Sequence, residues 1–488
     1  MMLNALKQET NFTNTEKGGV THKTSNSKVL DYFSQASALR NRSINGIISV
    51  VEKSLGEDPL LTLKVLFNSR DIRNGQGERD TFRKIVNYLA DNHTDLMIKN
   101  VKLIPEFGRW DDIFALYDTK LEPVAVSLIA EQLASDINSE TPSLCAKWLP
   151  SENASSKETR DLAIKTAKKL GLSLKEYRKT LSMLRKKIDI LETKVTEKRY
   201  EDIEYDKIPS QAGMKYRAAF YRNDPERYTN FVEQLSSGKK TINVGTLLPY
   251  QIVGKVIKSN FWFNKMDSNE RKLLNGMWEA LPDYISEDAS DTIAVVDVSG
   301  SMSGTPMEMA ISLGLYLAEK NKGAFKNHFI TFESNPHLVE VEGTDFVSKV
   351  MNIQNAPWGG STNIEKTFDL ILNTAIKHKL PQSELPERIV IISDMEFDHI
   401  ESGWYGYSNK TNFQVIEEKF KAAGYEMPRL VFWNVDARQT NIPMTMEKNV
   451  QLVSGPSPKL FEQILKDISA YELMLEILNN KIYDCITI

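Results

Sequence analysis

The hydrophobic pattern of this 488-residue chain changes near residue 290, and this change constrains the fold more than any other feature. Before that point, apolar residues recur every three to four positions, as at Ile48, Val51 and Leu55, which is the period of an amphipathic helix. After it, short apolar runs alternate with segments of helical period. The sequence therefore predicts two parts of different class, one all-α and one α/β.

In the first part, predicted helices follow one another and are separated by turn residues such as Pro105, Pro123 and Gly171. Consecutive helix pairs without strands favour a solenoid-like or ring-like helical array over residues 28–285. The polar residues 1–27 that precede it are expected to form a mobile N-terminal arm.

In the second part, residues 291–470, five apolar runs have the length of buried parallel strands. These runs are residues 292–298, 328–332, 388–393, 429–433 and 450–453. Their alternation with helices predicts a doubly wound parallel sheet, which binds ligands at the carboxyl ends of its strands. Residues 471–488 are expected to form a C-terminal helical tail that either packs back on the body or docks elsewhere.

Three predicted strand-end loops carry oxygen ligands, and they point to one cation site. In an extended chain Asp297 and Ser299 face the same way, and Gly300 lets the chain turn after them. Small divalent cations such as Mg²⁺ prefer oxygen ligands. The predicted ligands of Mg²⁺, or of another divalent cation such as Mn²⁺ or Ca²⁺, are Asp297, Ser299, Ser301, Thr362 and Asp394.

The spacing Asp-x-Ser-x-Ser at 297–301, the glycine-preceded Thr362 and the strand-end Asp394 resemble a known site. It is the metal-ion-dependent adhesion site (MIDAS) of von Willebrand factor A domains. The resemblance implies that the five residues hold an ion and that a carboxylate of a partner protein completes its coordination. Two alternatives stay open: Asp297 caps a helix, and the nearby Glu396 and Asp398 either lie behind the ligands or face solvent.

Segments of the first part resemble the Ro ribonucleoprotein (TROVE) family, in which a ring of HEAT-like helical repeats precedes such an A domain. The best matches are residues 73–82 (RNGQGERDTF) and 103–112 (LIPEFGRWDD). Residues 146–150, 213–217 and 247–250 resemble more closely an uncharacterised branch of that architecture in plants, fungi, bacteria and large DNA viruses.

The resemblance covers roughly residues 30–470 and implies an α plus α/β protein. An N-terminal all-α helical-repeat (HEAT-like) domain would be followed by a doubly wound parallel-sheet von Willebrand factor A domain. It also implies that the helical part binds RNA.

A basic window gives RNA binding a basis in charge. Residues 157–187 contain 11 basic and 3 acidic side chains, and basic side chains neutralise phosphates. The basic character continues at Lys215, Arg217, Arg222 and Arg227, which are interleaved with Tyr216, Tyr221 and Tyr228. The alternative is a solvated lysine-rich helix face, with these tyrosines in the core. The candidate RNA-binding residues are Lys147, Arg160, Lys168, Lys169, Arg185, Lys186, Lys187, Lys215, Arg217 and Arg222.

The motif at residues 73–80 has a structural reading as well. Gly75 and Gly77 would form an inter-helix turn, and Glu78, Arg79 and Asp80 a charge network with Arg109 or Asp112. We favour this reading over a phosphate cradle, because the chain has no GxxxxGK[ST] motif.

No residue set in the sequence supports catalysis, so we expect a non-enzymatic protein. The six histidines are scattered, and Cys145 and Cys485 lie too far apart in sequence for a disulfide framework or a cysteine-based zinc site. The chain has no secretory signal and no spanning run of about 18 apolar residues. We therefore expect no membrane partner and a cytoplasmic location, in the host cell if the protein is viral.

Two functions remain. The first is a Ro-like RNA-binding ribonucleoprotein component whose cation site holds an acidic residue of a protein partner. The second is a protein assembly scaffold that uses the same cation site without RNA. The basic window and the Ro resemblance favour the first.

Overall fold

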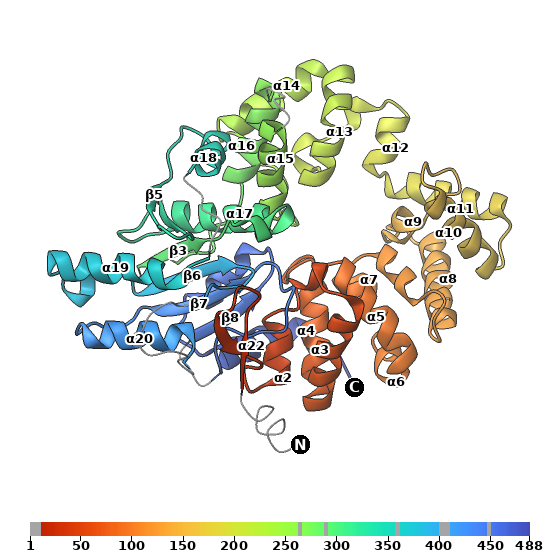
Figure 1. Cartoon of the computed structure of the whole chain (residues 1–488). Coiled ribbons are helices and arrows are strands. Elements are labelled where there is room, and N and C mark those ends of the chain that lie inside the picture. The colour runs from red at the N-terminus through yellow and green to blue at the C-terminus, as the bar shows by residue number, and fades with distance from the viewer. Residues whose placement is uncertain (1–10, 262–265, 287–290, 357–361, 400–409, 447–449) are drawn as a thin grey trace. The chain divides into compact units, whose positions relative to one another are not determined.

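A computed structural model of the chain describes residues 11–261, 266–286, 291–356, 362–399, 410–446 and 450–488 (Figure 1). The chain folds into two compact units. Met1–Val65 and Leu247–Lys481 form the first, called here the α/β unit, and Leu66–Thr246 with Ile482–Ile488 form the second, called here the helical unit.

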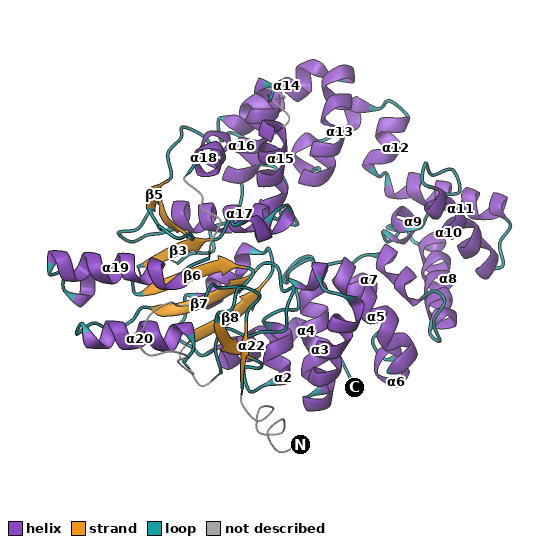
Figure 2. Cartoon of the chain, in the orientation of Figure 1, coloured by secondary structure: helices purple, strands orange, loops and turns teal. Residues whose placement is uncertain are grey.

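The α/β unit is built on a six-stranded sheet with the order β5-β4-β3-β6-β7-β8 (Figure 2). All neighbouring strands are parallel except β5, which pairs antiparallel with β4. The strands are β3 (Thr292–Val296), β4 (His328–Thr331), β5 (Leu338–Glu340), β6 (Arg388–Ser393), β7 (Arg429–Asn434) and β8 (Val450–Ser454). Every residue of β3, β6 and β8 is buried, as expected for a sheet covered on both faces.

Helices cover both faces of this sheet. Trp433 and Phe432 are neighbours on β7, so their side chains point to opposite faces. Trp433 contacts Phe461 of α21 (Phe461–Ile464), which stacks on Tyr316 of α17 (Thr305–Lys320). Phe432 contacts Phe413 of α20 (Asn412–Ala422), which packs against α19 (Ile364–His378). The predicted doubly wound α/β fold is confirmed.

Helices from both ends of the predicted helical domain belong to the α/β unit. They are α2 (Lys28–Phe33), α3 (Ile44–Glu57), α15 (Pro249–Phe261) and α16 (Ser268–Glu279). Helix α15 packs on α17 and on α18 (Phe346–Gln354). The C-terminal helix α22 (Ala470–Leu478) packs on β8 and α2, so this part of the predicted tail returns to the body.

The N-terminal segment is a hairpin attached to the α/β unit. Strands β1 (Phe12–Asn14) and β2 (Val20–His22) pair antiparallel. His22 and Ile442 exchange two backbone hydrogen bonds of 3.0 and 2.8 Å. The predicted mobile arm is therefore wrong for residues 11–27, and residues 1–10 lie outside the described part of the chain.

The helical unit contains the successive helices that the sequence predicts, and α4 (Pro59–Arg70) contains the boundary between the two units. Helix α10 packs on α11, and α13 packs on α14. The helices are α5 (Asp80–Asn92), α6 (Thr94–Ile98), α7 (Leu103–Phe107), α8 (Glu122–Asn138), α9 (Cys145–Trp148), α10 (Lys157–Lys169), α11 (Leu174–Ile188), α12 (Leu191–Thr196), α13 (Ser210–Asn223) and α14 (Pro225–Ser236).

A fully buried carboxylate, Asp112, ties this unit together. It accepts hydrogen bonds from Arg70 Nε at 2.8 Å, Arg83 Nε at 2.6 Å and the backbone N–H of Arg109 at 2.9 Å. Arg70 is itself only 1% exposed, so each charge depends on the other. This differs from the predicted network of Glu78, Arg79 and Asp80 with Arg109 or Asp112. The guanidinium partners of Asp112 are Arg70 and Arg83, and Arg79 pairs with Asp80.

The motif at residues 73–80 is a structural turn that leads into α5. Glu78 Oε1 accepts the backbone N–H groups of Asp80 and Thr81 at 3.1 and 3.2 Å, at the start of the helix. Gly75 is required there, because a Cβ would lie 1.9 Å from the carbonyl oxygen of Asn68. The favoured structural reading of this motif accounts for its glycines and acids.

We expect Asp112→Ala to lower the free energy of unfolding by about 3–5 kcal/mol, because it leaves the buried Arg70 charge without its partner. Asp80→Ala is the matched control, since the Asp80–Arg79 pair is exposed, and we expect it to cost about 1 kcal/mol or less. Urea unfolding followed by circular dichroism measures both. Equal effects would contradict the role given to Asp112.

Candidate metal centre

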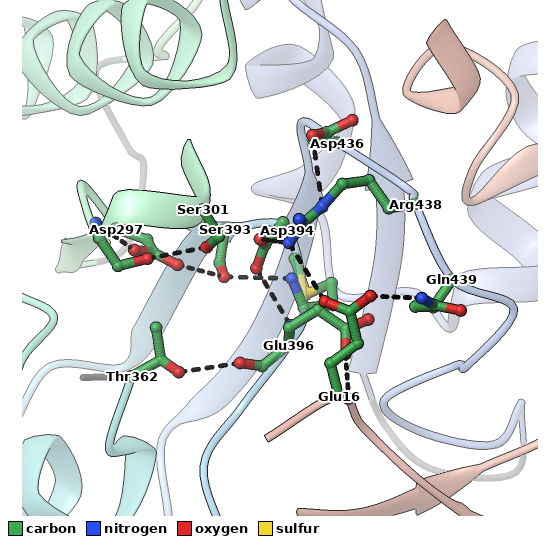
Figure 3. Close-up of polar contacts among 12 residues, drawn as sticks. Glu16, Asp297, Ser301, Thr362, Ser393, Asp394, Glu396, Asp436, Arg438 and Gln439 are labelled. Carbon is green, nitrogen blue, oxygen red and sulfur yellow. Dashed lines mark hydrogen bonds and ion pairs between the residues drawn. The ribbon is translucent and has the colours of Figure 1, made fainter. Parts of the chain in front are cut away.

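Two buried carboxylates lie at one edge of the sheet (Figure 3). Asp297 follows β3 and Asp394 follows β6, and these strands are paired in parallel up to Val296 and Ile392. The two strands therefore end together, and both carboxylates are held there at 0% and 1% exposure. The fold thus brings together the two acids of the predicted cation site.

The first loop arranges its hydroxyls around Asp297. The backbone N–H of Ser299 donates to Asp297 Oδ1 at 2.9 Å, and Ser393 Oγ donates to Oδ2 at 2.7 Å. A 3₁₀ turn over Gly300–Met302 follows, and the hydroxyl oxygens of Ser299 and Ser301 lie 3.0 Å apart. The short spacing of Asp-x-Ser-x-Ser is what permits this geometry.

Thr362 is fully buried just before α19 and is tied to the loop after β6. Its hydroxyl donates to the carbonyl oxygen of Glu396 at 2.8 Å, and its backbone N–H donates to Asp398 Oδ2 at 2.8 Å. Glu396 is 1% exposed and does not face solvent, whereas Asp398 is half-buried. The preceding residues 357–361, including Trp358, Gly359 and Gly360, lie outside the described residues.

Two positively charged side chains that the sequence did not suggest as site residues reach the predicted ligands. Arg438 Nη2 donates to Asp394 Oδ2 at 2.6 Å, and Lys17 Nζ donates to Thr362 Oγ1 at 2.9 Å. Arg438 follows β7, the next strand along the sheet, and this position is a signal that could have found it. Lys17 has no such signal, because its segment reaches the site from the N-terminal end of the chain.

The electrostatics of the site favour a bound cation. Burial, together with the charge of Asp394, raises the pKa of Asp297 to about 6. Burial also raises the pKa of Glu396 to about 7. Added positive charge therefore stabilises the ionised carboxylates here.

The donor set fits a hard divalent cation, since it offers two carboxylates and three hydroxyls. Within the described ranges, no group of three or more His, Cys, Asp or Glu is placed to hold a metal ion. The candidate site has only two carboxylates and no His or Cys, so it does not belong to the metal centres built from three or more such residues. Asp297, Ser299, Ser301, Thr362 and Asp394 are the residues that would hold the ion.

Most of the predicted RNA-binding residues in the helical unit are engaged within the fold. Arg185 donates to the carbonyl oxygens of Ala146 and Leu149, both at 2.8 Å, and to Ser151 Oγ at 2.6 Å. Five other predicted residues also have partners. Three donate to backbone carbonyl oxygens: Arg160 to those of Ala154 and Ser155, Lys187 to that of Ile137, and Arg217 to that of Met214. Two form ion pairs, Lys169 with Glu122 and Lys147 with Glu192. Arg185 is therefore a packing residue of this unit.

The tyrosines that lie between the basic residues of α13 and α14 also pack within the helical unit. Tyr228 is 2% exposed and packs against Tyr205, with ring centroids 4.9 Å apart, whereas Lys215 lies over the ring of Tyr216 at 4.9 Å. Tyr228 is thus a core residue and not a base-stacking platform.

One basic face remains open to solvent. Lys175, Lys179 and Lys186 on α11 are exposed, and their spacing of 4 and 7 residues places them on one side of the helix. Among the predicted residues, Lys168 and Arg222 are also exposed. The three lysines of α11 are called here the α11 lysine row.

Comparison with known proteins places the chain in a family. Residues 15–118 and 152–290 match the model of a domain of unknown function, DUF2828, and residues 291–481 match that of another, DUF7788. "Uncharacterized protein L728" of Acanthamoeba polyphaga mimivirus is 30% identical over 513 residues, covering 96% of this chain and 87% of that protein. The chain belongs to the family of this viral protein.

In this chain, the DUF2828 match ends at residue 290 and the DUF7788 match begins at residue 291, where the hydrophobic pattern changes. Among solved structures, the chain is similar to the "Crystal structure of Deinococcus radiodurans RO (RSR) protein", with 13% identity and a TM-score of 0.44 over 93% of this chain and 99% of that one. No helix in the described part of the chain has both the length and the apolar character needed to cross a membrane.

We expect divalent-cation binding to weaken below about pH 6. The cation needs the charged form of Asp297, and the raised pKa of about 6 makes protons compete for this carboxylate. Affinity should be nearly constant above about pH 7 and should fall by up to about tenfold for each pH unit below the pKa. Mn²⁺ titrations followed by electron paramagnetic resonance measure it. A constant affinity down to about pH 5 would contradict a ligand role for an Asp297 with this raised pKa.

Proposed function

We propose that this protein is a non-enzymatic binding protein whose α/β unit takes up a divalent cation, Mg²⁺ or a similar ion. The cation in turn holds a carboxylate of a protein partner. The observation that carries the proposal is the meeting of the buried Asp297 and Asp394 with the hydroxyl-bearing loops at one sheet edge. The arrangement supports the resemblance to the MIDAS of von Willebrand factor A domains.

The ligand chemistry explains why an acidic partner suits the site. Two carboxylates balance the charge of one divalent cation, and the serine and threonine hydroxyls add ligands without adding charge. The ion therefore remains attractive to one more carboxylate at an open coordination position. A centre with more carboxylates would repel such a ligand, so this donor set favours binding of an acidic group.

A second candidate function is RNA binding by the helical unit, and the α11 lysine row favours it. These three exposed ammonium groups stand on one helix face, where they can contact successive phosphates of an RNA backbone. With the cation site, this surface would make the protein a Ro-like ribonucleoprotein component. Without it, the protein would be an assembly scaffold.

We expect Asp297→Ala to weaken Mn²⁺ binding by about 100-fold or more, because it removes one of only two charged ligands. Isothermal titration calorimetry of the full chain measures the affinity. Glu384→Ala is the matched control, since Glu384 is an exposed acid on a surface turn of the same unit. Equal Mn²⁺ affinity in Asp297→Ala and the control would refute the site.

For the second function, we expect Lys175→Glu, Lys179→Glu and Lys186→Glu together to lower affinity for single-stranded RNA and to reduce the salt dependence of binding. Each lost phosphate contact lowers the salt slope by about 0.7 to 1. Fluorescence anisotropy with a labelled oligouridine at several salt concentrations measures both quantities. Lys366→Glu, Lys377→Glu and Lys421→Glu, at exposed lysines of α19 and α20, form the charge-matched control. If the two triple variants behave alike, the α11 lysine row is not the RNA surface.

A further inference from the structure

The N-terminal hairpin packs against the loop after β6, which carries the candidate metal ligand Asp394. Thr15 Oγ1 donates to the carbonyl oxygen of Phe397 at 2.6 Å, and Gly18 forms a β-bridge with Asp398. The turn is also held internally, because the backbone N–H of Gly19 donates to Thr15 Oγ1 at 2.9 Å. The turn of the hairpin, residues 15–19, is therefore held against the segment that follows Asp394.

Two glycines allow this close approach. A Cβ on Gly19 would lie 2.6 Å from the carbonyl oxygen of Phe397 and 2.9 Å from that of Asp398, both too close for an ordinary contact. Gly18 has φ of +86°, which favours glycine. A side chain at position 19 would push the turn away from the site.

The turn delivers the ammonium group of Lys17 to a predicted metal ligand. Lys17 Nζ donates to Thr362 Oγ1, while the proton of that hydroxyl points to Glu396. A divalent cation bound to the same oxygen would lie at most about 5 Å from the ammonium nitrogen, given a ligand distance of about 2.1 Å. Two positive charges so close repel each other strongly in a buried site, so Lys17 and the cation exclude one another.

The same turn also supports the second positive group. The backbone N–H of Glu16 donates to Glu396 Oε2 at 2.6 Å, and the Glu16 carboxylate lies 3.7 Å from Arg438 Nη2 (Figure 3). Gln439 donates to the same carboxylate. Arg438 in turn binds Asp394, so the hairpin stabilises a form of the site in which both Thr362 and Asp394 contact side-chain cations.

We propose that the N-terminal hairpin is a built-in competitor of the divalent cation, with Lys17 as the competing charge. In the closed form Lys17 binds Thr362 and the hairpin covers the loop after β6. Uptake of the cation expels Lys17, loosens residues 11–22 and opens the edge of the site to the partner carboxylate. This inference rests on the proposed cation-binding function.

The test is Mn²⁺ affinity, measured by calorimetry on the full chain with Lys17→Ala and Gly19→Ala. Lys17→Ala removes a charged hydrogen bond that the cation must otherwise break, so we expect Mn²⁺ to bind about tenfold more tightly or better. Gly19→Ala keeps the lysine but displaces the turn, so it should shift affinity in the same direction. Lys23→Ala is the control, because Lys23 is exposed just beyond β2.

A second readout follows the hairpin itself. Hydrogen exchange of the peptide covering residues 11–22 should become faster when Mn²⁺ is added to the unmodified chain, and should not change in Asp297→Ala. Mn²⁺ that leaves this exchange unchanged, or slows it, would overturn the proposal.

The outcomes separate the two claims. If Asp297→Ala loses Mn²⁺ while Lys17→Ala binds it within twofold of the unmodified chain, the competitor is refuted and the cation site stands. If the unmodified chain, Lys17→Ala and Asp297→Ala all fail to bind Mn²⁺, the cation site and the competitor both fall.

Discussion

Two carboxylates buried side by side at the ends of β3 and β6 are the constraint that organises the α/β unit. A buried charge is costly unless it is paired and hydrogen-bonded. Asp297 is held by Ser393 and by the backbone of Ser299, whereas Asp394 is held by Arg438. The strand ends, the loop after β7 and the N-terminal hairpin are therefore linked through one small region of negative charge.

This linkage gives the site two ways to balance its charge. In one, Lys17 and Arg438 of the chain itself contact the ligand residues. In the proposed cation-bound form, a divalent cation would supply the charge and leave a position for an external carboxylate. The first form keeps the hairpin in place, whereas the proposed form would release it, so the choice of cation would control access to the binding edge. The α11 lysine row belongs to the other compact unit and uses different chemistry, so the RNA proposal stands or falls separately.

The parts of the fold that could be predicted are those whose signal is local. The buried strands β3, β6, β7 and β8 are apolar runs that can be recognised in the sequence. Asp297, Ser299 and Ser301 lie within five consecutive residues, so their spacing is also visible there. Strand β5 was missed, because it is an edge strand of three residues, Leu338–Glu340, with little burial. The hairpin strands β1 and β2 were missed because each has only three residues and their partners, such as Ile442, are remote in sequence.

A count of charged residues along the sequence also fails to show which side chains are engaged within the fold. The basic window marks Arg185 and Lys186 alike, although Arg185 donates to carbonyl groups of its own unit and Lys186 faces solvent. Only the packing of α11 against α9 distinguishes them. Lys17 is the opposite case: it reaches Thr362 in the structure, but nothing in the sequence around it indicates a site residue.

Anomalous diffraction from crystals of the full chain grown with Mn²⁺ tests the cation site most directly. The proposal predicts an anomalous peak within coordination distance of oxygens from the loops that carry Asp297, Thr362 and Asp394, with the Lys17 ammonium no longer on Thr362. A map without that peak, in which Lys17 still binds Thr362 at saturating Mn²⁺, would contradict it.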